Sequence, residues 1–330
     1  MTDSMRDQIG LGVIGCASVA ARRMLPAIRE VPAVRLVAVA SRSAEKAAQF
    51  ATRFGCEAIT GYQNLLDRPD VDAVYVPLPP GLHHRWISLA LEAGKHVLAE
   101  KPLAMTRHDA VELVDLAVRK GRLLMENFAF VHHSQHATVQ ALVMQGAIGE
   151  PRSFSSSFGF PPLGSDNFRY RAELGGGALL DAGVYPIRAA QLLLGPDLEV
   201  CGACLRYDDQ TGVDVAGGAL LRTSRGVPVH LSFGFEHAYQ STYTLWGSLG
   251  ELTADRAFTP PPDLRPALHV TRMDLHKELT VPPGNQFARI CEQFARSVLD
   301  GHGFDQAYID IVRQATLVDA VREIAQRVVC

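Results

Sequence analysis

Short apolar runs recur along the first 126 residues, and between them lie longer segments whose apolar side chains have helical spacing. Apolar runs bounded by glycine or proline are typical of strands that are buried on both faces of a parallel sheet. This alternation predicts an α/β fold with a doubly wound parallel sheet. The expected strands are residues 9–14, 34–40, 57–60, 72–77, 97–100 and 123–126, and the expected helices are 20–30, 44–54, 83–93 and 106–120.

From about residue 127 onward the pattern changes, because apolar and polar positions alternate and aromatic residues become frequent. A period of two predicts a second, α+β domain with a large, mostly antiparallel sheet. We therefore expect residues 1–126 and 127–330 to form separate domains, with the C-terminal helix able to pack back on the first. The expected strands are 153–160, 198–207, 215–221, 227–235, 242–246 and 268–271, and the expected helices are 134–145, 285–299 and 306–328.

Net charge, apolar run length and cysteine placement limit the partners and the location that we expect for this protein. The formal net charge of the 330 residues is -3, which gives no electrostatic reason to expect nucleic acid or an anionic membrane as a partner. No apolar run reaches membrane-spanning length, and residues 1–8 are too polar for a secretory signal, so we expect a cytoplasmic protein. Cys201 and Cys204 form a C-x-x-C inside an expected strand, and we interpret them as small core residues and not as a metal or redox pair.

The first expected strand runs directly into a turn of small residues that reads G-x-A-x-x-A. Small side chains let the backbone approach a pyrophosphate at a helix N-terminus. A plain tight turn is the alternative, but the second strand follows at the distance that a βαβ unit requires, which favours dinucleotide binding. The residues assigned to cofactor binding here are Gly15, Cys16, Ala17, Ser18, Val19 and Ala20.

The end of the second strand indicates which dinucleotide binds. NAD enzymes usually carry an acidic residue there, which holds the ribose 2′-hydroxyl. This chain has Ser41, Arg42 and Ser43, a guanidinium between two hydroxyls, which suits a 2′-phosphate. Ser43 also fits the N-cap of the following helix. We therefore expect NADP(H) in preference to NAD(H).

The strand at 97–100 ends in Glu100, Lys101 and Pro102. Ligands in open α/β sheets bind beyond the carboxyl ends of the strands, so Lys101 is a candidate catalytic residue. The alternative is a surface lysine that closes a strand.

A second candidate region follows three glycines, Gly175–Gly177, which expose backbone or allow close approach. Asp181 and Tyr185 lie four residues apart and so share one face of a helix, although Pro186 is expected to disturb that helix. A buried core tyrosine and a helix-surface acid are the alternatives.

Three histidines, His132, His133 and His136, have spacing that permits a shared cation. No glutamate lies between them as in H-E-x-x-H, so we interpret them as hydrogen-bonded polar residues and predict no metal site.

The motifs together resemble the glucose–fructose oxidoreductase/inositol dehydrogenase (Gfo/Idh/MocA) family over nearly the whole chain. Many members have histidine where Tyr185 stands. The motifs that carry the resemblance are Gly15-x-Ala17-x-x-Ala20, Pro77-Leu78-Pro79…His83, Glu100-Lys101-Pro102 and Gly175-Gly176-Gly177…Asp181-x-Gly183-x-Tyr185. Further stretches, at 127–136, 183–190 and 236–239, resemble bacterial NDP-hexose 3-ketoreductases of deoxysugar biosynthesis.

The resemblance implies an N-terminal Rossmann domain and a C-terminal sheet whose open face packs against another subunit, giving a homodimer or homotetramer. It implies NADPH-dependent reduction of the C3 ketone of a dTDP-linked 3,4-diketo-2,6-dideoxyhexose, with a Lys–Pro bond that is often cis. It adds five residues to the expected cofactor site, namely Pro77, Leu78, His83, Glu100 and Asn127, and Lys101 belongs to that site too. A polar residue at a helix N-terminus is the alternative for His83.

Hydride transfer to a carbonyl carbon leaves negative charge on the oxygen, so the site must stabilise charge and supply a proton. We assign Tyr185 as the direct acid and Lys101 as the cation that polarises the oxygen, and the reverse assignment stays open. Aromatic stacking and guanidinium–phosphate pairing suit a nucleotide-sugar, although ordinary packing is the alternative for each residue. The expected substrate residues are Phe160, Arg169, Tyr170, Asp181 and Tyr239, with Phe158 as a further wall.

Two other functions stay open. An oxidative relative, such as a dihydrodiol or sugar dehydrogenase, would use NADP+ and a free hydroxyl compound. A non-catalytic sensor would keep the nucleotide fold, but it would have no need of both Lys101 and Tyr185.

Overall fold

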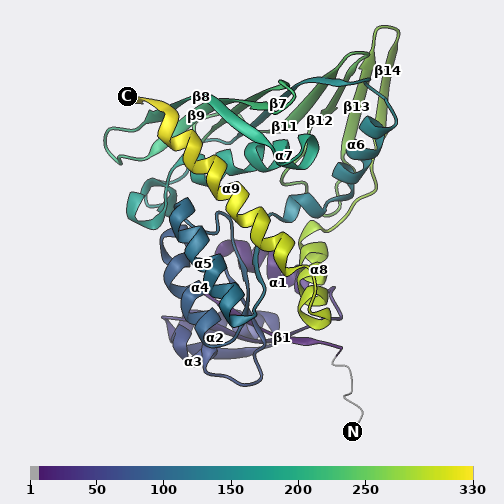
Figure 1. The fold of residues 1–330 in the computed structure, drawn as a ribbon. Coiled ribbons are helices and arrows are strands. Elements are labelled where there is room, and N and C mark those ends of the chain that lie inside the picture. The colour runs from purple at the N-terminus through teal and green to yellow at the C-terminus, as the bar shows by residue number, and fades with distance from the viewer. Residues whose placement is uncertain (1–6, 330) are drawn as a thin grey trace. The chain divides into compact units, whose positions relative to one another are not determined.

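The computed structural model describes residues 7–329, and this part of the chain divides into two compact units. Unit 1 covers the described chain up to Ala129 together with Phe287–Val312. Unit 2 covers Phe130–Gln286 and the described chain from Arg313 onward. Figure 1 shows that each unit is built around its own sheet.

Unit 1 contains a six-stranded, fully parallel sheet in the order β3-β2-β1-β4-β5-β6, which confirms the expected Rossmann fold. The chain proceeds to one side of β1 and then, at β4, to the other, so the carboxyl ends of β1 and β4 form the switch point at which such folds bind their ligands. The strands are β1 (Ile9–Ile14), β2 (Val34–Ser41), β3 (Glu57–Thr60), β4 (Ala73–Val76), β5 (His96–Ala99) and β6 (Leu124–Glu126).

Helices cover both faces of this sheet. On one face, side chains such as Met24, Phe54 and Phe294 share a core with strand residues that include Val13 and Tyr75. That face is covered by α1 (Leu25–Ile28), α2 (Ala44–Phe54) and α8 (Gln286–Asp300), whereas α3 (Tyr62–Leu66), α4 (His83–Glu92) and α5 (Arg107–Lys120) belong to the other.

Unit 2 contains a nine-stranded sheet that is mostly antiparallel, as expected, with parallel pairs at β7–β10 and β8–β15. Its strand order is β14-β13-β12-β11-β7-β10-β9-β8-β15. The strands are β7 (Pro151–Gly159), β8 (Leu198–Tyr207), β9 (Asp214–Thr223), β10 (Pro228–Gly234), β11 (Gln240–Gly247), β12 (Glu251–Ala254), β13 (Ala267–Arg272), β14 (Leu275–Thr280) and β15 (Ala325–Val329).

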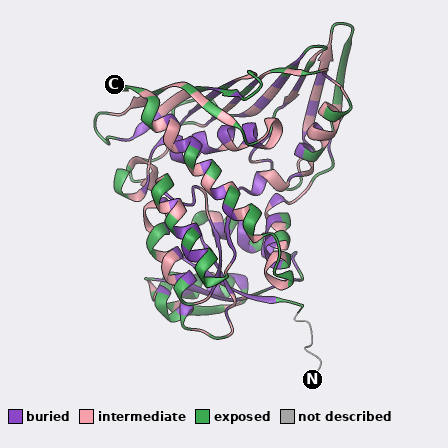
Figure 2. Ribbon diagram, viewed as in Figure 1, coloured by how far each residue is buried: buried purple, intermediate pink, exposed green. Residues whose placement is uncertain are grey.

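One face of this sheet is covered by α7 (Val184–Leu194), which contacts β7 and β10. Figure 2 shows that α7 is largely buried, whereas β14 is exposed along most of its length. The unit also contains α6 (Ser134–Met144) and the C-terminal part of α9 (Phe304–Ile324), a helix that begins in unit 1.

Two expectations in this unit are wrong. The helix expected over 306–328 ends at Ile324, and the chain continues as β15, because residues 325–329 pair with the free edge of β8. Cys201 and Cys204 are exposed and not in the core, since a bulge between Val200 and Gly202 breaks the alternation of β8.

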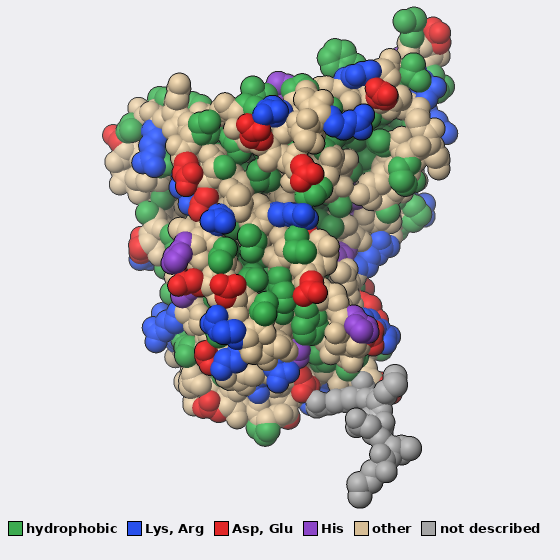
Figure 3. All heavy atoms as spheres, viewed as in Figure 1, with side chains coloured by type: hydrophobic (Ala, Val, Ile, Leu, Met, Phe, Trp, Pro, Cys, Tyr) green, Lys and Arg blue, Asp and Glu red, His purple; other side chains and the backbone are tan. Residues whose placement is uncertain are grey.

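Within residues 7–329, no helix is both long and apolar enough to cross a membrane. Figure 3 shows acidic and basic side chains interspersed over the face in view.

Candidate active site

The turn after β1 fits close approach by a bound group. Gly15 has φ +115°, and a Cβ there would lie 2.8 Å from Leu78 Cδ2, so only glycine suits this position. The helix that follows begins near Ser18 and runs through a π-helical turn at Ala20–Met24. Its first N–H groups therefore have no carbonyl partner within the helix, which is the arrangement that binds a pyrophosphate.

The three residues predicted to select the cofactor lie together at the end of β2. Ser43 caps α2, because its hydroxyl accepts from Lys46 N at 3.3 Å, and Ser41 Oγ accepts from Ser43 N at 3.2 Å. The Ser43 hydroxyl is partly exposed and can donate its own proton, and the Arg42 side chain is exposed beside it. Ser41 is buried, and its hydroxyl also forms a hydrogen bond with Cys16. This set of donors fits a 2′-phosphate.

Beyond β5, the Glu100 carboxylate is held by one residue inside β4 and one residue that follows β6. Its Oε1 accepts from Tyr75 Oη at 2.7 Å and from Asn127 Nδ2 at 2.6 Å. Burial raises the pKa of Glu100, and these donors oppose that shift. Asn127 is itself buried, and its Oδ1 has no hydrogen-bond partner among residues 7–329, so it suits a donor on a bound cofactor.

The loop that carries Lys101 is fixed on both sides of the lysine. The Lys101–Pro102 bond is cis. His83 is fully buried, with Nδ1 3.0 Å from Pro102 O and Nε2 2.7 Å from Leu78 O. Burial lowers the pKa of His83, and the Lys101 ammonium acts in the same direction. Leu103 N donates to Glu126 Oε1 at 2.8 Å, so the loop is anchored to β6 as well.

In unit 2, Tyr185 is the second residue of α7, and its ring lies within a cage of phenylalanines. Its centroid is 4.8 Å from that of Phe158, 5.5 Å from Phe258 and 5.8 Å from Phe130. Such edge and tilted contacts restrict the ring to one orientation. The packing of the ring therefore fixes the direction in which the Tyr185 hydroxyl points.

The turn before Tyr185 differs from a regular helix. Residues Leu179–Gly183 form a π-helical turn, and α7 follows directly. Pro186 explains it, because proline lacks an N–H and its ring would clash with the carbonyl four residues before it in a regular helix. A wider turn relieves both problems, and insertions of this kind are frequent at functional sites. The disturbance expected at Pro186 is thus present as a widened turn.

Asp181 is paired with another predicted substrate residue. Its Oδ2 accepts from Arg169 Nε at 2.6 Å, and the two side chains are 13% and 28% exposed. The start of the same helix is held by the buried Asp214, whose Oδ2 accepts from Leu179 N at 2.6 Å. A Cβ on Gly177 would lie 2.3 Å from Asp214 Oδ1, so this glycine allows the carboxylate to approach.

Other predicted substrate residues form two groups. Phe160 and Tyr170 both contact Phe235, with ring centroids 5.2 and 6.0 Å apart. Tyr239 is 41% exposed, donates to or accepts from Thr259 Oγ1 at 2.7 Å, and lies beneath the Arg256 guanidinium.

Two of the histidines weighed as metal ligands, His133 and His136, take part in protein hydrogen bonds. His136 is buried, with Nδ1 2.9 Å from Tyr243 Oη and Nε2 3.0 Å from Ala257 O. His133 Nδ1 accepts from Gln135 N at 3.2 Å and so caps α6.

Sequence reasoning missed Tyr75, Phe258 and Asp214. Tyr75 carried a signal, since it is the one polar side chain inside the strand Ala73–Val76. Phe258 and Asp214 gave none, because their roles depend on contacts with residues that are distant in the chain.

Two family descriptions match the chain. "Oxidoreductase family, NAD-binding Rossmann fold" matches residues 9–128, and "GFO/IDH/MocA C-terminal domain" matches residues 136–253. Among curated proteins, the dTDP-3,4-didehydro-2,6-dideoxy-alpha-D-glucose 3-reductase of Saccharopolyspora spinosa is 51% identical, over 96% of this chain and 97% of its own. The D-xylose 1-dehydrogenase (NADP(+)) 2 of Haloferax volcanii is 30% identical, over 96% and 97%.

Among solved structures, a 3-ketoreductase from Actinomadura kijaniata in complex with NADP and TDP-benzene has a TM-score of 0.96. It is 50% identical, and the match covers 98% of this chain and 99% of that one. Structures of the same enzyme with a lysine replaced by alanine or glutamate, or a tyrosine replaced by phenylalanine, also match.

Proposed function

The chain belongs to the Gfo/Idh/MocA oxidoreductase family, and we propose that it reduces the C3 ketone of a dTDP-linked 3,4-diketo-2,6-dideoxyhexose with NADPH. The proposal rests on a sequence identity of about one half, over nearly the whole chain, to reductases that act on this substrate. The hydrogen-bonded loop that carries Lys101 and the phenylalanine cage around Tyr185 support it. The product is the corresponding 4-keto sugar.

Bound NADPH supplies the hydride for the carbonyl carbon. We assign Lys101 the stabilisation of the carbonyl oxygen as it becomes negative, and Tyr185 the donation of the proton to that oxygen. His83 and Glu126 hold the backbone around Lys101, and the phenylalanine cage orients Tyr185. That a lysine and a tyrosine were the residues replaced in the Actinomadura enzyme supports this assignment.

Cofactor binding is assigned to residues at the carboxyl ends of the strands of the parallel sheet. Residues 15–20 bind the pyrophosphate through backbone N–H groups, and Ser41, Arg42 and Ser43 bind the 2′-phosphate. Pro77, Leu78, Glu100 and Asn127 lie at the carboxyl ends of β4, β5 and β6 and are assigned to the nicotinamide end, where His83 positions Leu78.

Substrate binding is assigned to residues of unit 2. The Arg169–Asp181 pair lies one turn before Tyr185, and we assign it to the sugar and the diphosphate. Phe160 and Tyr170 offer aromatic faces for the nucleotide, and Tyr239 is assigned to the same ligand.

The nine-stranded sheet supports a homo-oligomer. Strand register places Leu220, His230, Ser155 and Thr244 in one row across the sheet, on the face opposite Phe154 and Leu231. Leu220 is 41% exposed, and Trp246, two residues beyond Thr244 on the same face, is 63% exposed. A sheet face with large exposed side chains suits a second copy of the chain.

A cytoplasmic location of the protein stays a prediction.

The test is NADPH consumption with the dTDP-3,4-diketo-2,6-dideoxyhexose generated in situ by its upstream dehydratase. We expect oxidation of NADPH that requires this substrate and is much slower with NADH. A protein that binds NADPH yet consumes none would contradict the proposal. D-xylose and simple diols with NADP+ then test the oxidative alternative, which the relative from Haloferax volcanii favours.

A further inference from the structure

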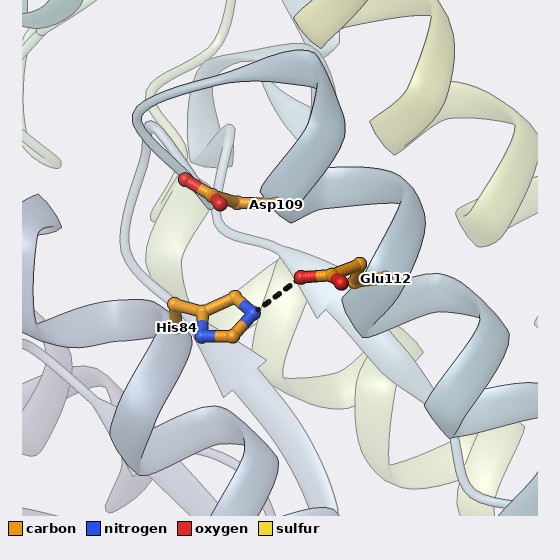
Figure 4. Close-up of side chains that lie close together, drawn as sticks. All are labelled: His84, Asp109 and Glu112. Carbon is orange, nitrogen blue, oxygen red and sulfur yellow. Dashed lines mark hydrogen bonds and ion pairs between the residues drawn. The ribbon is translucent and has the colours of Figure 1, made fainter.

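A cluster of metal-binding side chains lies between two helices of unit 1, outside the residues assigned to the reaction. His84 belongs to the first turn of α4, and Asp109 and Glu112 belong to the first two turns of α5. One donor atom from each lies within 4.8 Å of the other two. Figure 4 shows the three side chains projecting into the space between the starts of these helices.

The charges in this cluster favour a cation. Asp109 and Glu112 are three residues apart on one helix, so their carboxylates are neighbours and repel each other. Imidazoles flank both oxygens of Glu112, since His84 Nε2 lies 3.1 Å from Oε2 and His108 Nε2 lies 3.5 Å from Oε1. A divalent ion bound among these groups would remove the repulsion and accept the imidazoles in their neutral form.

From this arrangement we propose that His84, Asp109 and Glu112 form a surface site for a divalent transition-metal ion of the zinc type. Mixed imidazole and carboxylate donors suit zinc, whereas calcium and magnesium prefer sites made of oxygen atoms. Zinc–ligand bonds of about 2 Å bring tetrahedral donors to within about 3.4 Å of one another, so these donors must move closer by about 1 Å. His84 and Glu112 are 46% and 52% exposed and are free to make that adjustment.

The position of the site gives the ion a structural role. The neighbouring residue His83 bonds to the carbonyl groups of Pro102 and Leu103, and Asp109 follows the N-cap Thr106 of α5. An ion held by His84 and Asp109 would therefore join α5, which follows the 101–106 loop, to α4, whose His83 contacts that loop. It stabilises the fold around this loop and takes no part in the reaction.

Zinc binding to the untagged full-length protein tests the proposal, with competition against a chromophoric chelator as the readout. We expect one zinc ion per chain and an increase in the unfolding temperature when zinc is added. His84→Ala, Asp109→Asn and Glu112→Gln should each weaken binding by about tenfold or more, and His302→Ala, which removes an exposed histidine elsewhere in unit 1, should have no effect. Magnesium and calcium should not compete.

The exposed Cys201 and Cys204 offer zinc an alternative site, so the same titration is done with both replaced by serine. Retained binding supports the site between α4 and α5. Zinc that is lost with the cysteines, or an affinity unchanged by the three ligand replacements, overturns the proposal. Circular dichroism monitors folding. Because the three replaced residues are partly exposed, we expect the variants to fold, and a loss of zinc binding can then be distinguished from unfolding.

Discussion

Tyr75 and Glu100, 25 residues apart in the chain, are joined by a hydrogen bond of 2.7 Å at the carboxyl ends of adjacent strands. Tyr75 is fully buried in β4, and Glu100 precedes Lys101. The bond gives the buried carboxylate a donor, and Asn127 supplies a second at 2.6 Å. The orientation of the loop that carries Lys101 therefore depends on a side chain in the neighbouring strand.

Tyr75→Phe should lower both stability and turnover. The substitution leaves a buried carboxylate with one donor fewer, which costs about 1–3 kcal/mol of unfolding free energy. Urea unfolding and steady-state kinetics measure the two effects. Tyr308→Phe is the matched control, since Tyr308 donates to Arg122 O in the region near the other end of β5. Equal loss of turnover in both variants would contradict a role for Tyr75 near Lys101.

Tyr185→Phe and Lys101→Ala should each lower kcat strongly, with the fold unchanged. Loss of a general acid costs about 100-fold or more in rate, and loss of a charge-stabilising group costs a similar factor. Tyr207→Phe, on β8, serves as the control. Turnover near the wild-type value in either variant would reject that residue's assignment.

Arg42→Ala should reduce the preference for NADPH. The guanidinium is expected to form charge-assisted bonds to the 2′-phosphate, so its loss should raise the KM for NADPH by about tenfold or more and leave that for NADH unchanged. Arg35→Ala removes an exposed arginine from the opposite end of the same strand and should change neither constant. An unaltered cofactor ratio in Arg42→Ala would show that the 2′-phosphate is recognised elsewhere.

Trp246→Glu should dissociate the expected oligomer. Trp246 is 63% exposed on the open face of the sheet, and a carboxylate placed there would be buried without a partner in a face-to-face dimer. Light scattering coupled to gel filtration measures the mass. Met273→Glu places the same charge at a residue that is 96% exposed in the β13–β14 turn and should leave the mass unchanged. A wild-type monomer would contradict the expected assembly directly.

The sequence predicted the elements that depend on local pattern, and it failed where a contact with a distant segment decides the outcome. The parallel strands, and Lys101 at the end of one of them, follow from apolar runs and a proline. β15 could not be predicted, since residues 325–329 form a strand only because β8 offers a free edge. The pairing of Arg169 with Asp181 likewise depends on how the chain before α7 folds back.

The phenylalanine cage around Tyr185 is a second example of contacts that the sequence pattern does not predict. Phe158 was predicted as a wall of the site because aromatic rings suit a nucleotide-sugar, whereas Phe258 lies in the loop between β12 and β13, which has no periodicity. Its place beneath Tyr185 is set by buried polar groups, because Phe258 N donates to Ser241 Oγ at 3.0 Å and Gln286 Nε2 donates to Phe258 O at 3.0 Å. Pairings of this kind have no signature in a single sequence.

His136 should make the protein less stable in acid. Its neutral ring accepts from Tyr243 Oη and donates to Ala257 O, and burial lowers the pKa of His136 to about 3. The unfolded chain has the ordinary value of about 6.5, so between these values the unfolded state binds more protons than the folded state. Stability from this group is therefore complete above about pH 6.5 and decreases as the pH falls toward 3, by at most about 1.4 kcal/mol per pH unit.

His96, whose pKa is lowered to about 4 mainly by burial, adds a similar slope in unit 1, so the two contributions must be separated. The free energy of unfolding in urea is measured from pH 7 to pH 5 for the wild type and for His136→Gln. The variant is expected to be less stable at pH 7, because the bonds to Tyr243 and Ala257 are perturbed, but to lose less stability on acidification. His276→Ala, at an exposed position of β14, should retain the wild-type slope. A His136→Gln protein with the full wild-type pH dependence would mean that the acid sensitivity comes from groups other than His136.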